Sequence, residues 1–240
     1  MRLLKFVTVC WLCFSTSGYS QILPFEAEYQ ADFKGIPLAK GYRQLLDLGN
    51  NIYQIRSTAT ALAGGLKYDD TSRFTYYQGN VKSLGFVHKQ EGLFSSLQAI
   101  GHPDRNGGLI VQVDGTHHHF EAPENVHQLL DAAGFSVQLQ NDLKKGLTDL
   151  HYYYNVIDEV DNYRFHVIAE EAITTGLGTF DTLKIEQKKG DNRSTWLWLA
   201  PELDYQLIKA EIVRNGSTWA SLEATRIDIK ADSQLAQTAP

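Results

Sequence analysis

The sequence predicts a mainly β protein: a single antiparallel, strongly curved sheet that forms a barrel or half-barrel, with one helical insertion around residues 123–145. Apolar and polar residues alternate from Phe25 to Phe33, which is typical of a strand with one dry and one wet face. Phe25, Tyr29 and Phe33 would then join an aromatic core. Tight-turn residues separate many such stretches. Because strand twist accumulates and exposed edges aggregate, so long a sheet must curve or close.

The predicted strands follow one another as a meander. Alternation returns in three later stretches, Tyr163–Val167, Leu183–Glu186 and Ala210–Ile212, and it favours antiparallel pairing over parallel pairing. Hairpin turns are expected at five glycine- and asparagine- or aspartate-containing sites, residues 49–51, 106–108, 114–115, 190–192 and 215–216. This spacing gives about eight strands before the helical insertion and about five or six after it.

The helical insertion is predicted from Pro123, which suits a first helical turn, to a C-terminal cap at Lys144-Lys145-Gly146. Gly134 is expected to break it, so that Phe135–Leu143 is either a second helical piece or an extended crossing segment. The apolar face of the first piece would consist of Val126, Leu129, Leu130 and Ala133.

The first 20 residues have the pattern of a cleavable export signal. Arg2 and Lys5 supply positive charge, and Phe6–Phe14 is an uncharged, mostly apolar run of nine residues. Small residues at Gly18 and Ser20 predict cleavage before Gln21. The apolar run is too short for a membrane anchor, which takes about 20 residues.

The exported chain would be acidic and free of cysteine. The whole chain has 22 Lys+Arg and 28 Asp+Glu, a net charge of −6, and loss of Arg2 and Lys5 leaves 20 against 28, or −8. We therefore expect no nucleic-acid partner. Cys10 and Cys13 both lie in the signal, which excludes disulfides and cysteine-bound metals.

No linker divides the rest of the chain, and no later segment is apolar enough to span a membrane. We expect one β-rich domain over residues 21–230 and a polar, disordered tail over residues 231–240.

Aromatic residues at alternating positions would line the inside of the curved sheet. Tyr152 and Tyr154 follow the helical insertion directly, which makes them candidates for the rim of a cavity. Trp196 and Trp198 share one strand face, a spacing that favours a core aromatic pair over a ligand-stacking platform. Together with Tyr205 these four residues are the predicted ligand-binding set. The sequence leaves open whether the interior is a packed core or a cavity.

His117 and His119 are weak candidates for a metal site. Both would lie on one strand face, where two imidazoles could hold zinc or copper with a carboxylate from Asp114 or Glu121. The run directly follows an Asp-Gly turn, however, and it lacks the four ligands of a closed site. We therefore predict no metal and no cofactor.

No catalytic residue can be named from the sequence. The chain contains no Gly-x-Ser-x-Gly, Ser-x-x-Lys, phosphate loop or dinucleotide fingerprint. The adjacent carboxylates Glu170-Glu171 and Asp69-Asp70 would point to opposite faces of their strands, so neither pair can act on one substrate. An enzyme would need at least two side chains to meet in a cleft, chosen from nearby carboxylates and from His88, His102, His151 and His166.

Four segments carry a likeness to a known family: Phe25–Tyr29, Gly35–Gly41, Glu171–Ile185 and Trp198–Tyr205. On these residues the chain resembles bacterial exported proteins catalogued as domain of unknown function 3108, over nearly the whole exported chain. The resemblance implies a periplasmic, β-rich fold. It implies no established activity and no catalytic residues.

Three functions remain open. The preferred one is a non-enzymatic binding or carrier module for a lipid or another apolar or envelope-derived ligand, with the helix as a lid or plug. The second is a structural or interaction protein that binds an envelope protein partner through a sheet edge or apolar patch. The third is an envelope hydrolase. The preferred function requires a cavity, since ligand pockets typically measure about 300–1,000 Å³.

Overall fold

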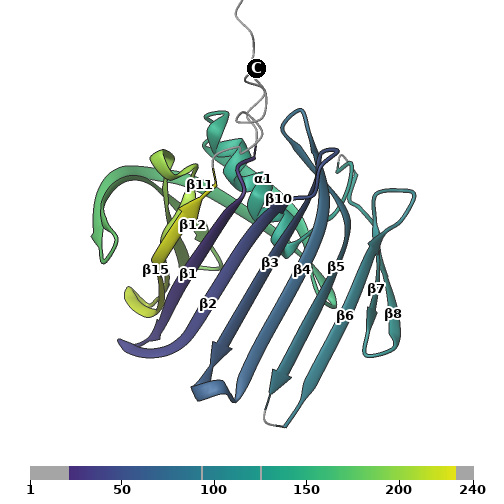
Figure 1. Ribbon diagram of the computed structural model, residues 1–240, viewed down its shortest axis with the longest axis horizontal. Coiled ribbons are helices and arrows are strands. Elements are labelled where there is room, and N and C mark those ends of the chain that lie inside the picture. The colour runs from purple at the N-terminus through teal and green to yellow at the C-terminus, as the bar shows by residue number, and fades with distance from the viewer. Residues whose placement is uncertain (1–21, 93, 125, 231–240) are drawn as a thin grey trace, which may run out of the picture.

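The computed structural model describes residues 22–92, 94–124 and 126–230, which form one 15-stranded sheet around a single α-helix (Figure 1). The predicted signal over residues 1–20, both cysteines and the tail over residues 231–240 lie outside the described residues. Among those described, no helix is long and apolar enough to cross a membrane.

The order of elements matches the predicted meander. The strands before the helix are β1 (Phe25–Phe33), β2 (Ile36–Asp47), β3 (Ile52–Ala61), β4 (Leu66–Tyr77), β5 (Asn80–Gly92), β6 (Ser96–Pro103), β7 (Leu109–Val113) and β8 (Thr116–Phe120). The two-residue strand β9 (Leu130–Asp131) leads into α1 (Ala132–Lys144). The strands after it are β10 (Asp149–Val156), β11 (Glu159–Thr175), β12 (Gly178–Lys188), β13 (Arg193–Ala200), β14 (Gln206–Arg214) and β15 (Ser217–Ile229). Short 3-10 helices occupy η1 (Leu62–Gly64) and η2 (Pro201–Leu203).

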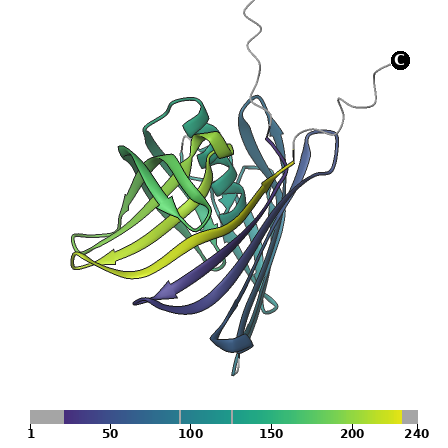
Figure 2. The ribbon, with the colours of Figure 1, turned by 60° about the vertical axis from the view of Figure 1, so that its left-hand side comes forward.

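The sheet is a half-barrel, as predicted, and it does not close. Its order runs from β8 through β1 to β15 and on to β9, so β8 and β9 are the two free ends. Neighbouring strands are antiparallel except β9 and β10, which pair parallel over two residues. Two walls, β1–β8 and β10–β15, curve around α1 and meet where β1 pairs with β15 (Figure 2).

All five predicted hairpin turns are present. They join β2 to β3, β6 to β7, β7 to β8, β12 to β13 and β14 to β15. At the first of them Asn50 and Asn51 have φ angles of 54° and 59°, the left-handed region that asparagine tolerates better than most residues. The local turn chemistry thus helps to determine the register of these five strand pairs.

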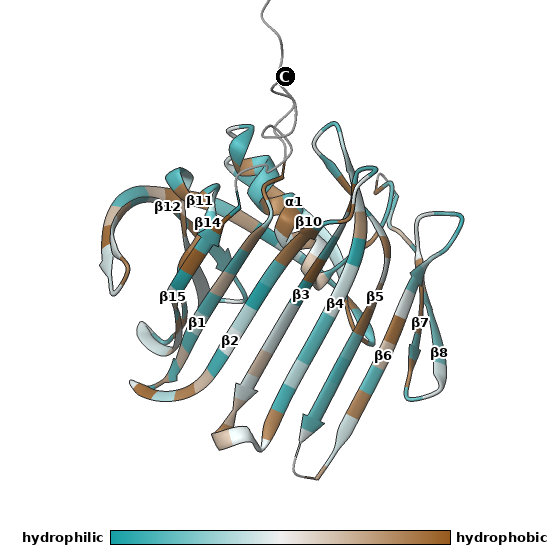
Figure 3. Cartoon of the chain, in the orientation of Figure 1, coloured by the Kyte–Doolittle hydropathy of each residue, from teal (hydrophilic) through white to brown (hydrophobic). Residues whose placement is uncertain are grey.

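The core lies on the concave side, between the sheet and α1. Phe25, Ala27 and Tyr29 of β1 are buried as the alternation predicts. In Figure 3 hydrophobic residues lie on α1 and on the parts of β2 and β3 beside it, where Leu45 and Ile55 are fully buried. Phe33 departs from the prediction, because it is only partly buried and packs edge-on against Trp219 with ring centroids 4.8 Å apart.

The helix begins later than predicted. Pro123 does not start it, and Leu129 and Leu130 precede it instead of forming its apolar face. The start is Asp131, whose carboxylate accepts hydrogen bonds from the backbone N–H groups of Ala133 (3.1 Å) and Gly134 (2.9 Å). Gly134 therefore lies inside the first turn and is not a break. The predicted C-terminal cap is confirmed, with Gly146 at a φ of 79° after the last turn.

The helix is fastened to both walls of the sheet. On one side the carbonyl of Gly79, in the β4–β5 turn, accepts hydrogen bonds from Gln138 (3.2 Å) and Lys145 (2.8 Å). On the other side Lys144 forms an ion pair (2.6 Å) with Asp204, which lies in the β13–β14 connection. These contacts make α1 a plug that is held in the concavity from two directions.

Candidate ligand-binding site

Two adjoining cavities lie along α1 on the concave side. The first, here the polar cavity, has a volume of about 370 Å³ and adjoins the first turn of the helix. The second, here the apolar cavity, has a volume of about 220 Å³ and follows the helix toward Gln140. Arg43 and Ser136 line both, so they stand where the two cavities meet. The interior is thus partly hollow, which the sequence left undecided.

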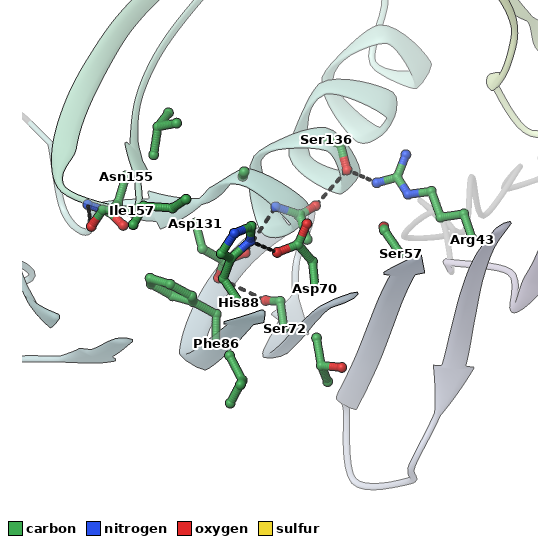
Figure 4. Close-up of a pocket in the computed structure, with 15 residues that line it drawn as sticks. Arg43, Ser57, Asp70, Ser72, Phe86, His88, Asp131, Ser136, Asn155 and Ile157 are labelled. Atoms are coloured by element: carbon green, nitrogen blue, oxygen red, sulfur yellow. Dashed lines mark hydrogen bonds and ion pairs between the residues drawn. The ribbon is translucent and has the colours of Figure 1, made fainter. Parts of the chain in front are cut away.

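Four polar side chains from four neighbouring strands form one row across the floor of the polar cavity. Arg43 of β2 is directly opposite Ser57 of β3, Ser57 is opposite Asp70 of β4, and Asp70 is opposite His88 of β5. All four line the cavity (Figure 4). Directly opposed residues share a sheet face, so the register alone brings this polar row together.

Asp131 forms the helix side of the polar cavity and is 3% exposed. Besides capping α1, its carboxylate accepts hydrogen bonds from the hydroxyls of Ser72 (2.8 Å) and Ser83 (3.0 Å). Burial raises the pKa of Asp131 above its ordinary value, although its four hydrogen bonds act in the opposite direction. This carboxylate is fully engaged in holding the helix to β4 and β5.

Asp70 and His88 form a pair at one end of the polar row. The Asp70 carboxylate contacts Nδ1 of His88, whose side chain is largely buried. Nε2 of His88 and Oδ1 of Asn155, which also lines the cavity, are buried without a hydrogen-bond partner among the described residues. The pair can bind or move a proton, but no serine hydroxyl contacts Nε2 in the described part of the chain, as a nucleophilic triad would require.

Arg43 stands at the other end of the polar row. Its Nη2 donates a hydrogen bond to the hydroxyl of Ser136 on α1, while its Nε is buried without a partner (Figure 4). Among the described residues no carboxylate forms an ion pair with it. Burial lowers the pKa of Arg43 below its ordinary value, yet a guanidinium stays charged in proteins. The cavities therefore share one cation, for which the described part of the chain provides no counter-ion.

The apolar cavity is lined mainly by aromatic and aliphatic side chains, although Gln140, Gln187 and Thr195 also contribute to its wall. Phe135 of α1 stacks on Tyr154 with ring centroids 4.4 Å apart, and on Phe165 at 5.4 Å. Leu197, Leu199 and Leu207 complete the wall from β13 and β14. This mixture of stacked rings and branched side chains suits an apolar ligand group.

The three tyrosines predicted to bind a ligand all lie in or near the wall of the apolar cavity, but they make different contacts. Tyr154 lines the apolar cavity. Tyr152 lies beside it under Phe135, and its hydroxyl donates a hydrogen bond to Asp142 (2.9 Å). Tyr205 packs against the same aromatic cluster, and its carbonyl accepts a hydrogen bond from Gln140 (3.1 Å). Burial raises the pKa of both Tyr152 and Tyr154, so these phenols stay neutral.

The tryptophan pair does not line either cavity. The two rings contact each other edge-on, 6.3 Å between centroids, but they face away from Leu197 and Leu199, which lie on the inner face of the same strand. Lys184 lies over both rings, and the indole N–H groups of Trp196 and Trp198 donate to Glu186 (3.2 Å) and Glu171 (2.6 Å). Trp198 is buried, so the predicted pair exists, but under charged side chains on the outer face and not in the core.

The weak metal candidates form no cluster. Nε2 of His119 lies 2.6 Å from a carboxylate oxygen of Asp104, and neither Asp114 nor Glu121 provides that carboxylate. His117 is exposed. The described residues contain no group of three or more His, Cys, Asp or Glu side chains that could hold a metal ion.

A further hollow of about 390 Å³ lies away from the helix, among residues of the β1–β2 hairpin and η1. Its wall includes Leu38 and Ala63, which are exposed residues of the hairpin tips, and its only ionisable side chain is Lys40. It is a surface groove rather than an enclosed site.

Sequence reasoning named His88 as a candidate but did not pair it with Asp70, and it missed Arg43 and Ser57, although a signal for part of the row exists. Arg43 stands two residues before Leu45, and Asp70 stands four before Phe74, on the face that burial assigns to the core. A charged residue on the dry face of an alternating strand is costly unless it has a partner or a purpose. That pattern could have drawn attention to Arg43 and Asp70.

Comparisons with known proteins give a structural relative and no sequence relative. A scan against protein-family models finds no match, and no curated protein matches. Among solved structures, the chain is similar to the crystal structure of a beta-barrel-like protein of domain of unknown function DUF1849 from Brucella abortus, with a TM-score of 0.58 and 9% sequence identity. The match covers 88% of this chain and 99% of that chain. At this identity the likeness shows the fold alone, and membership of domain of unknown function 3108 stays a prediction.

Proposed function

We propose that this protein is a non-enzymatic binding or carrier module that holds an apolar or envelope-derived ligand, such as a lipid, against α1. The observation that carries the proposal is the pair of adjoining cavities on the concave side, of about 370 and 220 Å³. Small-molecule sites are concave, mostly apolar and furnished with a few polar groups, which describes these two cavities.

The proposal includes a place of action. The pattern of residues 1–20 supports export with cleavage before Gln21, and the resemblance to domain of unknown function 3108 supports the periplasm as the compartment. Because a hydrogen bond holds α1 to one wall and an ion pair holds it to the other, the helix would act as the fixed plug against which the ligand packs.

Native mass spectrometry of the protein purified from its own periplasm tests the proposal. A lipid or glycan adduct that survives gentle ionisation, on a chain that begins at Gln21, is the expected result. A ligand-free chain bound to another protein would instead favour a structural or interaction protein of the envelope.

An envelope hydrolase is the second candidate, because Asp70 and His88 meet inside the polar cavity. Such a pair could activate a water molecule as a general base. Replacing His88 by Gln would then abolish the release of a chromogenic alcohol from short-chain esters by the wild-type protein. Wild-type protein without esterase activity would exclude this candidate on that substrate class.

A further inference from the structure

The strongest unused feature of the structure is the unpaired cation at the junction of the two cavities. Resting on the proposed binding function, we infer that Arg43 and Ser57 form a subsite for the anionic group of an amphiphile, a carboxylate or a phosphate, whose apolar chain lies in the apolar cavity. Ser136 positions the guanidinium, because its oxygen accepts from Arg43 while its hydroxyl donates to the carbonyl of Ala133 (2.6 Å). The three side chains come from β2, β3 and α1 and line the same space (Figure 4).

The donor set fits an anion and no other charge. A guanidinium offers five N–H donors and no acceptor, and the described contacts use it for one side-chain hydrogen bond, to Ser136. The Ser57 hydroxyl, directly opposite Arg43 in the sheet, has no side-chain partner among the described residues. Carboxylates and phosphates are the groups that such a fork of donors binds best.

The negative groups of the polar row do not neutralise Arg43. Asp70 is two strands away, a separation of about 9–10 Å at ordinary strand spacing, with Ser57 between them. Its carboxylate is engaged by His88, and that of Asp131 is engaged by two hydroxyls and two backbone N–H groups. Each of the carboxylates in the cavity therefore has partners of its own, and Arg43 has no counter-ion among the described residues.

The surroundings of Arg43 determine where the rest of the ligand lies. The same side chain lines the apolar cavity, whose wall of Phe135, Tyr154, Leu197 and Leu199 has no charged group besides Arg43. An anionic head at Arg43 can thus pair with the guanidinium while its chain leaves water for an apolar wall. A neutral amphiphile would gain the burial of its chain but not the pairing with the guanidinium.

The experiment compares three ligands with the same twelve-carbon chain: dodecanoate, dodecyl phosphate and 1-dodecanol. Binding to delipidated wild-type protein is measured by isothermal titration calorimetry. We expect at least one of the two anions to bind about tenfold to a hundredfold more tightly than the alcohol, as for a charged hydrogen bond of ordinary strength. The stronger of the two anions identifies the head group as carboxylate or phosphate.

Arg43→Met removes the charge and keeps the length of the side chain. In this variant the preference for the anions over 1-dodecanol should disappear, and Arg43→Lys should restore part of that preference. Arg73→Met is the matched control, because Arg73 is exposed on the other face of β4. This variant should have the same affinities for the three ligands as the wild type.

The outcomes separate this inference from the proposed function. Wild-type protein that binds 1-dodecanol as tightly as both anions overturns the anionic subsite and leaves the binding function standing. Wild-type protein that binds none of the three ligands counts against both. Because the comparison of ligands needs only the wild-type protein, a variant that fails to fold does not leave the inference untested.

Discussion

The polar and apolar cavities adjoin along one helix and share Arg43 and Ser136, yet their walls are held in different ways. Around the polar cavity the contacts are hydrogen bonds between strands and helix, centred on Asp131. Around the apolar cavity they are stacked rings and leucines, centred on Phe135. One half of the site is therefore fixed by direction-dependent contacts and the other by packing, which suits a polar head and an apolar chain respectively.

Replacing Asp131 by Ala is expected to have the largest effect on stability. The change removes the helix cap and leaves two buried hydroxyls and two N–H groups without an acceptor, so the free energy of unfolding should fall by about 3 kcal/mol. Urea denaturation followed by circular dichroism measures it. Asp131→Asn, which can still cap the helix, should lower the free energy of unfolding by less. Asp191→Ala, in an exposed turn, should leave it almost unchanged. An equal loss in all three variants would contradict the role given to Asp131.

Replacing Leu199 by Ala tests the packed half of the site. Leu199 is 2% exposed, and truncating it should lower the free energy of unfolding by about 2 kcal/mol, the low end for a buried leucine because a cavity already lies beside it. The variant should also bind hexadecanoate better relative to dodecanoate than the wild type does, since the apolar cavity is enlarged. Leu48→Ala, at a 48% exposed hairpin position, is the control for the stability change. If the variant shows the same preference between the two fatty acids as the wild type, the alkyl chain of the ligand does not lie beside Leu199.

Replacing Arg43 by Met should raise the free energy of unfolding of the ligand-free protein, by about 1 kcal/mol. The change removes an uncompensated charge from a partly buried position and adds apolar contacts beside Tyr154 and Leu197, at the loss of one hydrogen bond to Ser136. Thermal and urea unfolding without ligand measure the difference. A gain of stability with a loss of anion binding is the signature of a binding residue, whereas a loss of stability would make Arg43 a structural residue.

The sheet was predictable from the sequence because its determinants are local. Alternation in β1 and the asparagine-glycine turns specify strands and register without reference to the rest of the chain. The start of α1 was not predictable from the sequence, because Asp131 is stabilised there by Ser72 and Ser83, which lie 59 and 48 residues away in the sequence. From local preference, Pro123 was predicted to start the helix and Gly134 to break it, and tertiary contacts overrode both.

The site shows the same division between local and distant determinants. Tyr154 was predicted because its position after the helical insertion is visible in the sequence. His88 was a candidate from the sequence, but its row with Asp70, Ser57 and Arg43 was missed because only the register of four strands brings these residues together. Trp198 was predicted to lie on the inside because its aromatic character was given the most weight. The lysines and glutamates of the neighbouring strands lie on the same face as Trp198, and they mark that face as the outer one.

The outer face of β13 provides the smallest predicted effect and tests whether the tryptophan pair takes part in the site. A hydrogen bond from Trp198, with a further contribution from Lys184, holds the pKa of Glu171 below its ordinary value. The ionised carboxylate then stabilises the folded state above the ordinary pKa, and that contribution is lost as the pH falls through the lowered pKa of the folded state. The Glu171 side chain is 41% exposed, so the contribution should be only about 0.3 kcal/mol.

Glu171→Gln should therefore weaken the dependence of unfolding free energy on pH between about pH 5 and 3, where carboxylates with ordinary and lowered pKa values titrate. Glu170→Gln is the matched control, because Glu170 points to the opposite face of β11 and makes no side-chain hydrogen bond among the described residues. Dodecanoate affinity at neutral pH should be the same in both variants as in the wild type, since the indoles face away from both cavities. A loss of affinity in Glu171→Gln alone would mean that the outer face is coupled to the site, and the separation between the inside and the outside of this wall would have to be abandoned.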